Sequence, residues 1–206
     1  MRYNGRFSGF RPHPNVEGTH AVLSASNYHW VNDSEEKFIE RLGTLQAAKK
    51  GTRLHAWASE AILLGRRQPE EGEPGYDILS QYINDALDLG LIPEQVLMYS
   101  MYAFGTADTV GFEEYEHDSH FAGFLRVHDF KSGRIEVKQP TQLYMYAVFF
   151  CLEYGYKPFE IEGELRIYQR DMIKSFEIDR SHLSFLYDRT RVRNALAEER
   201  GLGGLI

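Results

Sequence analysis

The segment Asp129-Phe130-Lys131 combines a carboxylate and an ammonium group at a spacing that could do chemistry. It follows the largely apolar run 124–128 and precedes Ser132-Gly133, a pattern typical of a β-strand that ends in a turn. Because side chains two apart on a strand face the same side, Asp129 and Lys131 are expected to project together. A carboxylate can bind Mg²⁺ while a lysine stabilises negative charge on phosphate, so the pair suits hydrolysis of a phosphodiester.

Two other segments carry the same acid-x-Lys spacing, Glu35-Glu36-Lys37 and Glu136-Val137-Lys138. The first lies in a helical pattern, where residues two apart do not face each other. The second follows Arg134 and could belong to a short strand, so it is a competitor. Taken alone, each triplet is more often a surface ion pair than a catalytic site. Only the wider sequence context separates them.

A second acidic residue, Asp108, favours the first of these triplets. It closes the segment Gly105-Thr106-Ala107-Asp108, which ends a strand pattern rich in tyrosine and methionine. Glycine allows close approach of the backbone there, and the aspartate would emerge at the strand end. Mg²⁺ is usually held by one or two carboxylates together with waters and phosphate oxygens, so Asp108 could be the second ligand. The pattern Gly-x-x-Asp by itself is also typical of an ordinary turn.

The elements that must position these residues follow from hydrophobic periodicity and turn residues. Helical spacing of apolar residues predicts helices over 34–45, 52–65 and 76–89. Strand patterns follow over 96–104, 109–112 and 121–130, then a helix over 140–153, strands over 159–168 and 173–178, and a last helix from about Ser181. This order predicts an α/β or α+β layer, with a mixed sheet flanked by helices.

Length and composition favour a single domain over residues 1–206. A chain of 206 residues that is 43% hydrophobic and 14% aromatic can bury one substantial core. Within it we expect an N-terminal arm or cap over 1–33 and a helical part over 34–92. The catalytic sheet and helix would follow over 93–180, and a C-terminal helix and tail over 181–206.

Cysteine count and charge exclude several classes of protein. The single cysteine, Cys151, excludes a disulfide framework, a four-thiolate zinc site and a cysteine-ligated iron–sulfur cluster. The net charge of −7 argues against a protein that coats nucleic acid, but clustered carboxylates that hold metal also lower the net charge, so a nuclease remains compatible. No basic segment followed by an apolar one stands at the start of the sequence, as a signal peptide would require, and the apolar run 144–152 is too short to span a membrane. We therefore expect a cytoplasmic protein without a membrane partner.

In their order along the chain, these residues resemble the PD-(D/E)XK nuclease superfamily, most closely its RecB-like and phage-exonuclease branch. Asp108 is similar to the first acidic position of the family, and Asp129 with Lys131 is similar to its D-x-K motif. The segment Gln142-Leu143-Tyr144-Met145-Tyr146 resembles the Q-x-x-x-Y motif that follows on a helix. Upstream, Gly51-Thr52-Arg53-Leu54-His55 is similar to a helix motif whose histidine joins the metal ligands.

The resemblance implies a restriction-endonuclease-like fold with a centre for Mg²⁺ or Mn²⁺. Its ligands would be His55, Asp108, Asp129 and the backbone carbonyl of Phe130, with Lys131 as catalytic base or electrostatic stabiliser. Without the motif, a lone histidine beside an apolar stripe is more often a core residue than a ligand. An imidazole ligand suits Mn²⁺ better than Mg²⁺, so we expect higher activity with manganese. The iron–sulfur cysteines of some RecB-like nucleases are absent.

Residues beyond the metal centre would bind DNA. The resemblance implies that Gln142 and Tyr146 position a DNA strand, and residues four apart on a helix do share a face. The alternative for Tyr146 is a core aromatic without a contact to DNA. Lys49, Lys50 and Arg53 flank the start of the expected His55 helix and could meet phosphates, although a solvated face is equally consistent.

The expected activity is hydrolysis of DNA phosphodiesters. Resemblance to phage recombination exonucleases favours an exodeoxyribonuclease that acts on linear ends. The nearest alternative is an endonuclease with the same site, and a second is a non-cutting, nucleic-acid-binding member of the fold. The partners implied are DNA and a recombination protein, with a homo-oligomer left open. A phage-encoded protein of this kind would act in the cytoplasm of the bacterial host.

Overall fold

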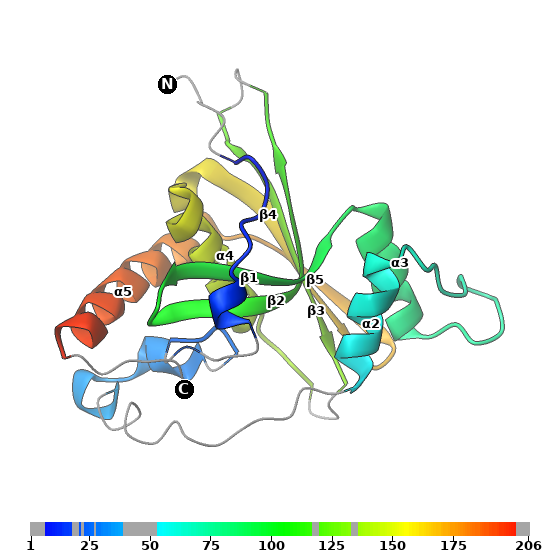
Figure 1. Ribbon diagram of the computed structural model, residues 1–206, viewed down its shortest axis with the longest axis horizontal. Coiled ribbons are helices and arrows are strands. Elements are labelled where there is room, and N and C mark those ends of the chain that lie inside the picture. The colour runs from blue at the N-terminus through cyan, green and yellow to red at the C-terminus, as the bar shows by residue number, and fades with distance from the viewer. Residues whose placement is uncertain are drawn as a thin grey trace.

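The computed structural model shows how the elements pack, and Figure 1 gives their arrangement. It describes residues 7–17, 21, 23–26, 28–38, 53–116, 120–132 and 136–200. In chain order the elements are η1 (Pro14–Val16), η2 (Tyr28–Asn32), α2 (Arg53–Leu63), α3 (Ile78–Asp88), β1 (Ile92–Ser100), β2 (Ala103–Glu114), β3 (Gly123–Lys131), α4 (Thr141–Tyr154), η3 (Pro158–Glu160), β4 (Ile161–Gln169), β5 (Met172–Glu177) and α5 (Arg180–Glu199). Of the helix expected over 34–45, residues 35–38 are helical and residues 39–45 lie outside the described part.

Five strands form one mixed sheet in the order β1-β2-β3-β4-β5. Neighbouring strands are antiparallel except β3 and β4, which run parallel. Parallel neighbours need a crossover connection, and the segment that contains α4 supplies it. The expected α/β class, with a mixed sheet flanked by helices, is therefore confirmed. None of the described helices is long and apolar enough to cross a membrane.

The expected strand over 96–104 is wrong, because the chain turns in the middle of it. β1 ends at Ser100, which pairs with Ala103 at the start of β2 across a tight turn. No glycine, proline or asparagine marks this turn. Instead, the main-chain amide of Tyr102 donates a 3.0 Å hydrogen bond to Ser100 Oγ. β1 also begins earlier than expected and contains Pro93, which a strand at the edge of a sheet tolerates.

The helix ends follow from local chemistry. Asp77 precedes α3, and its carboxylate accepts a 2.8 Å hydrogen bond from the amide of Ser80, which satisfies one of the free N–H groups at the helix start. Gly65 follows α2 with a φ of 63°, and Gly155 follows α4 with a φ of 72°. Glycine adopts this left-handed conformation at little steric cost, so both helices end there.

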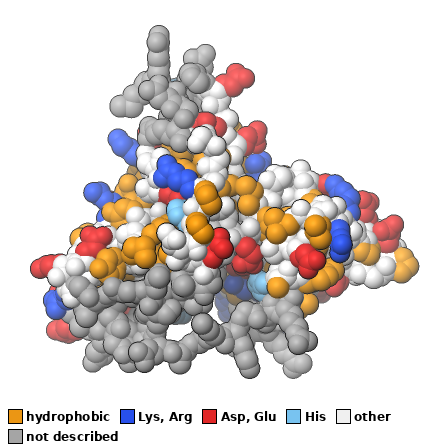
Figure 2. All heavy atoms as spheres, viewed as in Figure 1, with side chains coloured by type: hydrophobic (Ala, Val, Ile, Leu, Met, Phe, Trp, Pro, Cys, Tyr) orange, Lys and Arg blue, Asp and Glu red, His pale blue; other side chains and the backbone are white. Residues whose placement is uncertain are grey.

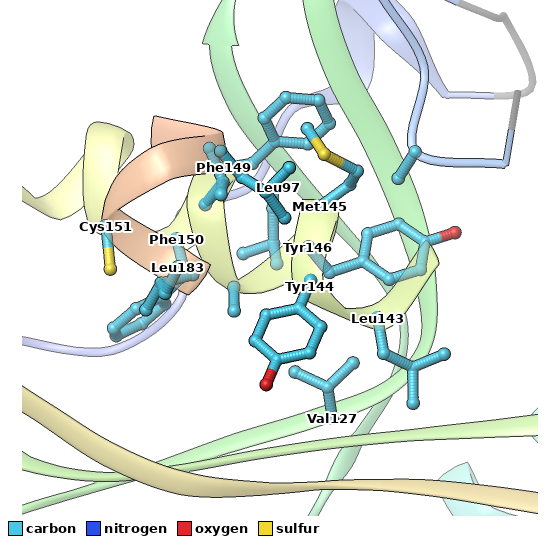
Figure 3. Close-up of a cluster of buried hydrophobic side chains, with 14 of the residues drawn as sticks. Leu97, Val127, Leu143, Tyr144, Met145, Tyr146, Phe149, Phe150, Cys151 and Leu183 are labelled. Atoms are coloured by element: carbon cyan, nitrogen blue, oxygen red, sulfur yellow. The ribbon is translucent and has the colours of Figure 1, made fainter. Parts of the chain in front are cut away.

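α4 is the central element of the core on one side of the sheet, where it lies between the strands and α5 (Figure 1). Its side chains from Leu143 to Cys151 are all buried. Figure 3 shows part of this cluster, which joins Leu97 and Val127 of the sheet to Leu183 of α5. Each such apolar side chain contributes about 1.5–3 kcal/mol when it is fully buried. Burial on nearly every side explains why the helix is apolar almost all round.

A second core lies under α2 and α3, on the side of the sheet away from α4 (Figure 1). It contains Ala58 and Ile62 of α2, Ile83 of α3, and Phe130 and Tyr168 of the sheet. The Phe130 ring belongs to this core because successive side chains on β3 point to opposite faces. The packing holds α2 next to the end of β3.

Candidate active site

Asp108 is not at the end of a strand, as expected, but inside β2, at the point where this strand separates from β3. β2 pairs with β1 on both sides of this residue, but it pairs with β3 only from Thr109 to Glu114. At the end of that ladder, the main-chain amide of Phe130 donates a 3.0 Å hydrogen bond to Asp108 Oδ2. The carboxylate therefore takes the place of a strand partner at the fork between β2 and β3.

Asp129 and Lys131 project together from the end of β3, as their spacing predicts. Lys131 Nζ lies 3.0 Å from Asp129 Oδ1 and 2.9 Å from Asp129 Oδ2. The same ammonium donates a 2.9 Å hydrogen bond to Gln142 Oε1 in the first turn of α4. Asp129 is fully buried, while 25% of the Lys131 side chain is exposed. The lysine thus connects a buried carboxylate to solvent.

His55 reaches this fork from the first turns of α2. Its Nδ1 atom lies 3.2 Å from Asp108 Oδ2, and its ring packs edge-on against the ring of Phe130, with 5.7 Å between centroids. The hydrogen bond to Asp108 and then the Asp108 charge raise the pKa of His55, against the opposing effect of burial. The structure therefore brings His55, Asp108, Asp129 and Lys131 together, although they come from three separate parts of the sequence.

Asp129 is short of positive partners. Burial, and next the nearby Asp108 charge, raise the pKa of Asp129 to about 7, although Lys131 opposes the change. Apart from the ion pair with Lys131, Asp129 Oδ2 accepts no hydrogen bond from the described residues. A buried carboxylate in this state gains from any further positive charge that reaches it.

A divalent cation fits these donors. Carboxylate oxygens of Asp108 and Asp129 are the ligands that Mg²⁺ prefers, and the imidazole of His55 also suits Mn²⁺. Among the described residues, no three acidic, histidine or cysteine side chains already surround one point, so a cation would have to compete with Lys131 for Asp129. The backbone carbonyl of Phe130 belongs to the same stretch of chain, and its role as a ligand stays a prediction.

Gln142 and Tyr146 share one face of α4, as expected for residues four apart. Gln142 Nε2 donates a 3.1 Å hydrogen bond to the Tyr146 hydroxyl, while Gln142 Oε1 accepts from Lys131. Tyr146 is only 2% exposed, and burial followed by the charges of Asp108 and Asp129 raises its pKa well above the ordinary value. A continuous chain of polar contacts therefore runs from Tyr146 through Gln142 and Lys131 to Asp129. The expected contact of Gln142 and Tyr146 with DNA stays a prediction.

The basic residues expected to meet DNA lie at the limit of the described chain. Lys49 and Lys50 are outside the described residues. Arg53 is the first residue of α2, and the structure describes its backbone position alone. Its place at the N-terminus of α2, two residues before His55, agrees with the expected start of this helix.

The rival triplet Glu136-Val137-Lys138 does not form a strand. Glu136 forms an ion pair with Lys174 of β5, and this hydrogen bond and charge lower the pKa of Glu136. The main-chain amide of Val137 donates a 2.9 Å hydrogen bond to the side chain of Gln169. Residues 136–138 are therefore outside any strand, and Glu136 has the contacts of a surface ion pair.

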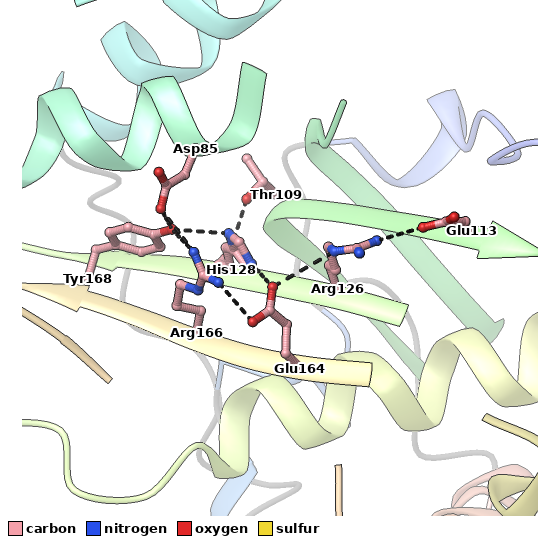
Figure 4. A network of polar contacts seen from close by, with 8 residues as sticks. All are labelled: Asp85, Thr109, Glu113, Arg126, His128, Glu164, Arg166 and Tyr168. Atoms are coloured by element: carbon pink, nitrogen blue, oxygen red, sulfur yellow. Dashed lines mark hydrogen bonds and ion pairs between the residues drawn. The ribbon is translucent and has the colours of Figure 1, made fainter. Parts of the chain in front are cut away.

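A partly buried polar network next to the site has no counterpart in the sequence motifs (Figure 4). His128 is fully buried, and its ring nitrogens lie 3.3 Å from the Tyr168 hydroxyl and 3.3 Å from Glu164 Oε1. Arg166 donates hydrogen bonds to Glu164 at 2.9 Å and to Asp85 of α3 at 3.0 Å. The network links β3, through His128, to β4 and α3. His128 directly precedes Asp129, the acidic residue of the Asp129-Phe130-Lys131 triplet. Period-two alternation could have identified His128 as buried, but not its partners.

Another acidic side chain, Glu94 of β1, lies close enough to Asp108 for their charges to interact. Figure 2 shows acidic side chains in the middle of one face of the molecule, where the α2–α3 pair meets the rest of the fold. No motif in the sequence marks Glu94. Only the pairing of β1 with β2 brings it to the site.

Comparison with known proteins gives this arrangement no family assignment. The PD-(D/E)XK resemblance therefore rests on the motif residues and on their convergence in space. No protein-family model matches the chain, and no curated protein matches it in sequence.

Proposed function

We propose that the protein is a divalent-cation-dependent deoxyribonuclease of the PD-(D/E)XK type. One observation carries the proposal: an acid-x-Lys pair at a strand end converges with a second carboxylate and an imidazole from distant segments. Asp129 and Lys131 are in direct contact, and Asp108 is in contact with His55. The ordinary alternative for such a spacing is a surface ion pair, in which both charged groups are exposed to solvent, whereas Asp129 is fully buried.

His55, Asp108, Asp129 and the carbonyl of Phe130 would hold the Mg²⁺ or Mn²⁺ ion. When bound, such an ion acts as a Lewis acid on the phosphate and lowers the pKa of a coordinated water. The protein contributes a fixed and partly dry setting for it. Asp108 is fixed by the amide of Phe130, and Asp129 by its burial and its ion pair with Lys131.

Lys131 supplies the second part of the chemistry. Its ammonium is held between Asp129 and Gln142, so its position is set before substrate arrives. From there it would stabilise negative charge that develops on the attacked phosphate, or orient the attacking water. Tyr146 would act indirectly, by fixing which way the Gln142 amide points.

DNA is the substrate that the resemblance favours, and an exonuclease acting on linear ends is the favoured version. A recombination protein would then be a natural partner, because digestion of one strand exposes the other for pairing. An endonuclease would use the same residues and would differ only in how the surrounding surface admits DNA.

The deciding experiment compares end-labelled linear DNA with covalently closed circular DNA, each with Mg²⁺, Mn²⁺ or EDTA. We expect cation-dependent loss of label from linear DNA, greater activity with Mn²⁺, and intact circles. Asp129→Asn should be inactive, and Glu136→Gln, which removes an acidic charge from the rival triplet, should retain activity.

Other results of the cleavage assay would indicate a different function. Cutting of closed circles would replace the exonuclease with an endonuclease at the same site. Cation-dependent binding of DNA without cleavage would indicate a non-cutting member of the fold. Degradation that persists in EDTA, or that survives Asp129→Asn, would overturn the proposed function.

A further inference from the structure

The register of β1 and β2 places Glu94 directly opposite Asp108. The two neighbours of Glu94 in β1 pair with the two neighbours of Asp108 in β2. Like charges at directly opposite positions of an antiparallel pair are destabilising. A carboxylate pair at this position therefore needs an explanation.

The backbone of Glu94 is also unusual. Its φ is 50°, in the left-handed region that residues other than glycine rarely adopt. The other such residue among those described is Arg170, which lies in the turn between β4 and β5, where this conformation is common. Glu94 is inside a strand, where no turn requires it. Strained backbone of this kind concentrates at functional sites.

The charges around Glu94 are unbalanced. No described lysine or arginine forms an ion pair with it, and the charged groups that act on its carboxyl are Asp108 and His55. Glu94 is exposed at the edge of the sheet, yet partial desolvation of its carboxyl first, and then the charge of Asp108, raise its pKa. Its charge also reaches the hydroxyls of Tyr82 and Tyr146. Glu94 therefore belongs to the same electrostatic environment as the candidate cation site.

We propose that Glu94 is a third carboxylate of this cation site and raises its affinity for Mg²⁺ or Mn²⁺ from the β1 side of Asp108. The inference rests on the proposed function, since it concerns the same cation. A bound divalent cation would offset the repulsion between Glu94 and Asp108, so relief of that repulsion adds to the affinity. Without the cation, the same repulsion destabilises the fold.

The test measures Mn²⁺ affinity without DNA, by titration calorimetry and by the electron paramagnetic resonance signal of free Mn²⁺. We expect Glu94→Gln to weaken Mn²⁺ binding roughly 10-fold, the lower end of the loss seen when residues supporting a metal site are changed. In EDTA, the same variant should melt at the wild-type temperature or above it.

The matched control is Glu113→Gln, which removes the same charge from β2 at a position paired with Arg126 instead of the site. It should leave Mn²⁺ affinity unchanged, and a loss equal to that of Glu94→Gln would mean that net charge alone is responsible. Glu94→Gly provides a second variant, because glycine accepts the backbone conformation without strain. It should lose affinity as Glu94→Gln does.

Failure of this inference differs from failure of the proposed function. If the wild type binds Mn²⁺ and Asp129→Asn loses it, but Glu94→Gln and Glu94→Gly bind as the wild type does, then Glu94 is not part of the site. If the wild type itself binds no Mn²⁺, the proposed cation-dependent function falls, and the role of Glu94 falls with it.

Discussion

The Asp108 carboxylate accepts a hydrogen bond from the main-chain amide of Phe130 at 3.0 Å, where the ladder between β2 and β3 has ended. The same oxygen atom lies 3.2 Å from Nδ1 of His55. One oxygen therefore connects α2, β2 and β3. Asp108 should have a structural role in addition to any chemical one, whereas Asp129 should not.

The first prediction contrasts these two aspartates. Asp108→Ala leaves the amide of Phe130 without its acceptor, which should lower the free energy of unfolding by about 1–3 kcal/mol. Asp129→Asn removes a charge that burial disfavours, so its loss of stability should stay below about 1 kcal/mol. Both variants should lose cleavage. Urea unfolding in EDTA measures the stabilities, and equal losses for the two variants would contradict the structural role of Asp108.

The second prediction concerns the choice between the two triplets. Lys131→Ala should abolish cleavage, because it removes the positive charge at the site, and it should also lower stability, because the buried Asp129 carboxylate loses its ion-pair partner. Glu136→Ala should be nearly silent in cleavage, because its partner is Lys174 at the surface. A cleavage assay with both variants checks this. The reverse pattern would show that the catalytic triplet is the one at Glu136.

The third prediction separates two roles for Tyr146. If its hydroxyl orients Gln142 and Lys131, Tyr146→Phe should lower kcat about tenfold or more while leaving DNA affinity unchanged. Tyr144→Phe is the matched control, because that hydroxyl accepts a 2.9 Å hydrogen bond from the amide of Asp179, away from the site. Steady-state kinetics and DNA-binding anisotropy distinguish the cases. A raised KM with weaker DNA binding and normal kcat would favour a direct DNA contact.

The fourth prediction is a pH dependence of stability from the network in Figure 4. The hydrogen bond with His128 and then that with Arg166 lower the pKa of Glu164 to about 2, against the effect of burial, whereas its ordinary value is 4.5. A lowered carboxyl pKa stabilises the fold above the unfolded value, and this contribution is lost as the pH falls from 4.5 toward 2.

The stability advantage of the wild type over Glu164→Gln should therefore shrink by on the order of 2 kcal/mol between pH 6 and pH 3. Urea unfolding at both pH values measures it. Glu162→Gln, on the same strand but outside the network, should show no such change in its difference from the wild type. A pH-independent difference for Glu164→Gln would mean that the network does not stabilise the charged carboxylate.

The sequence alone determined the features that depend on local pattern. Helical spacing of apolar residues with Gly65 after them placed α2, and the helix expected over 140–153 agrees with α4 to within a residue at each end. Alternation on β3 set Asp129 and Lys131 on one side, and four-residue spacing on α4 aligned Gln142 with Tyr146. The class of fold followed from the order of these elements, since each type of element has its own hydrophobic period.

Only the tertiary structure decided the features that depend on pairing between distant segments. The turn at Met101-Tyr102 contains no typical turn residue, so the strand expected across it was wrong. Without that turn, the sequence could not predict the β1–β2 register that places Glu94 opposite Asp108. The fork at Asp108 and the partners of His128 likewise arise where strands and helices meet. A hydrophobic period specifies which face of an element is buried, but the identity of what covers that face is set by long-range contacts.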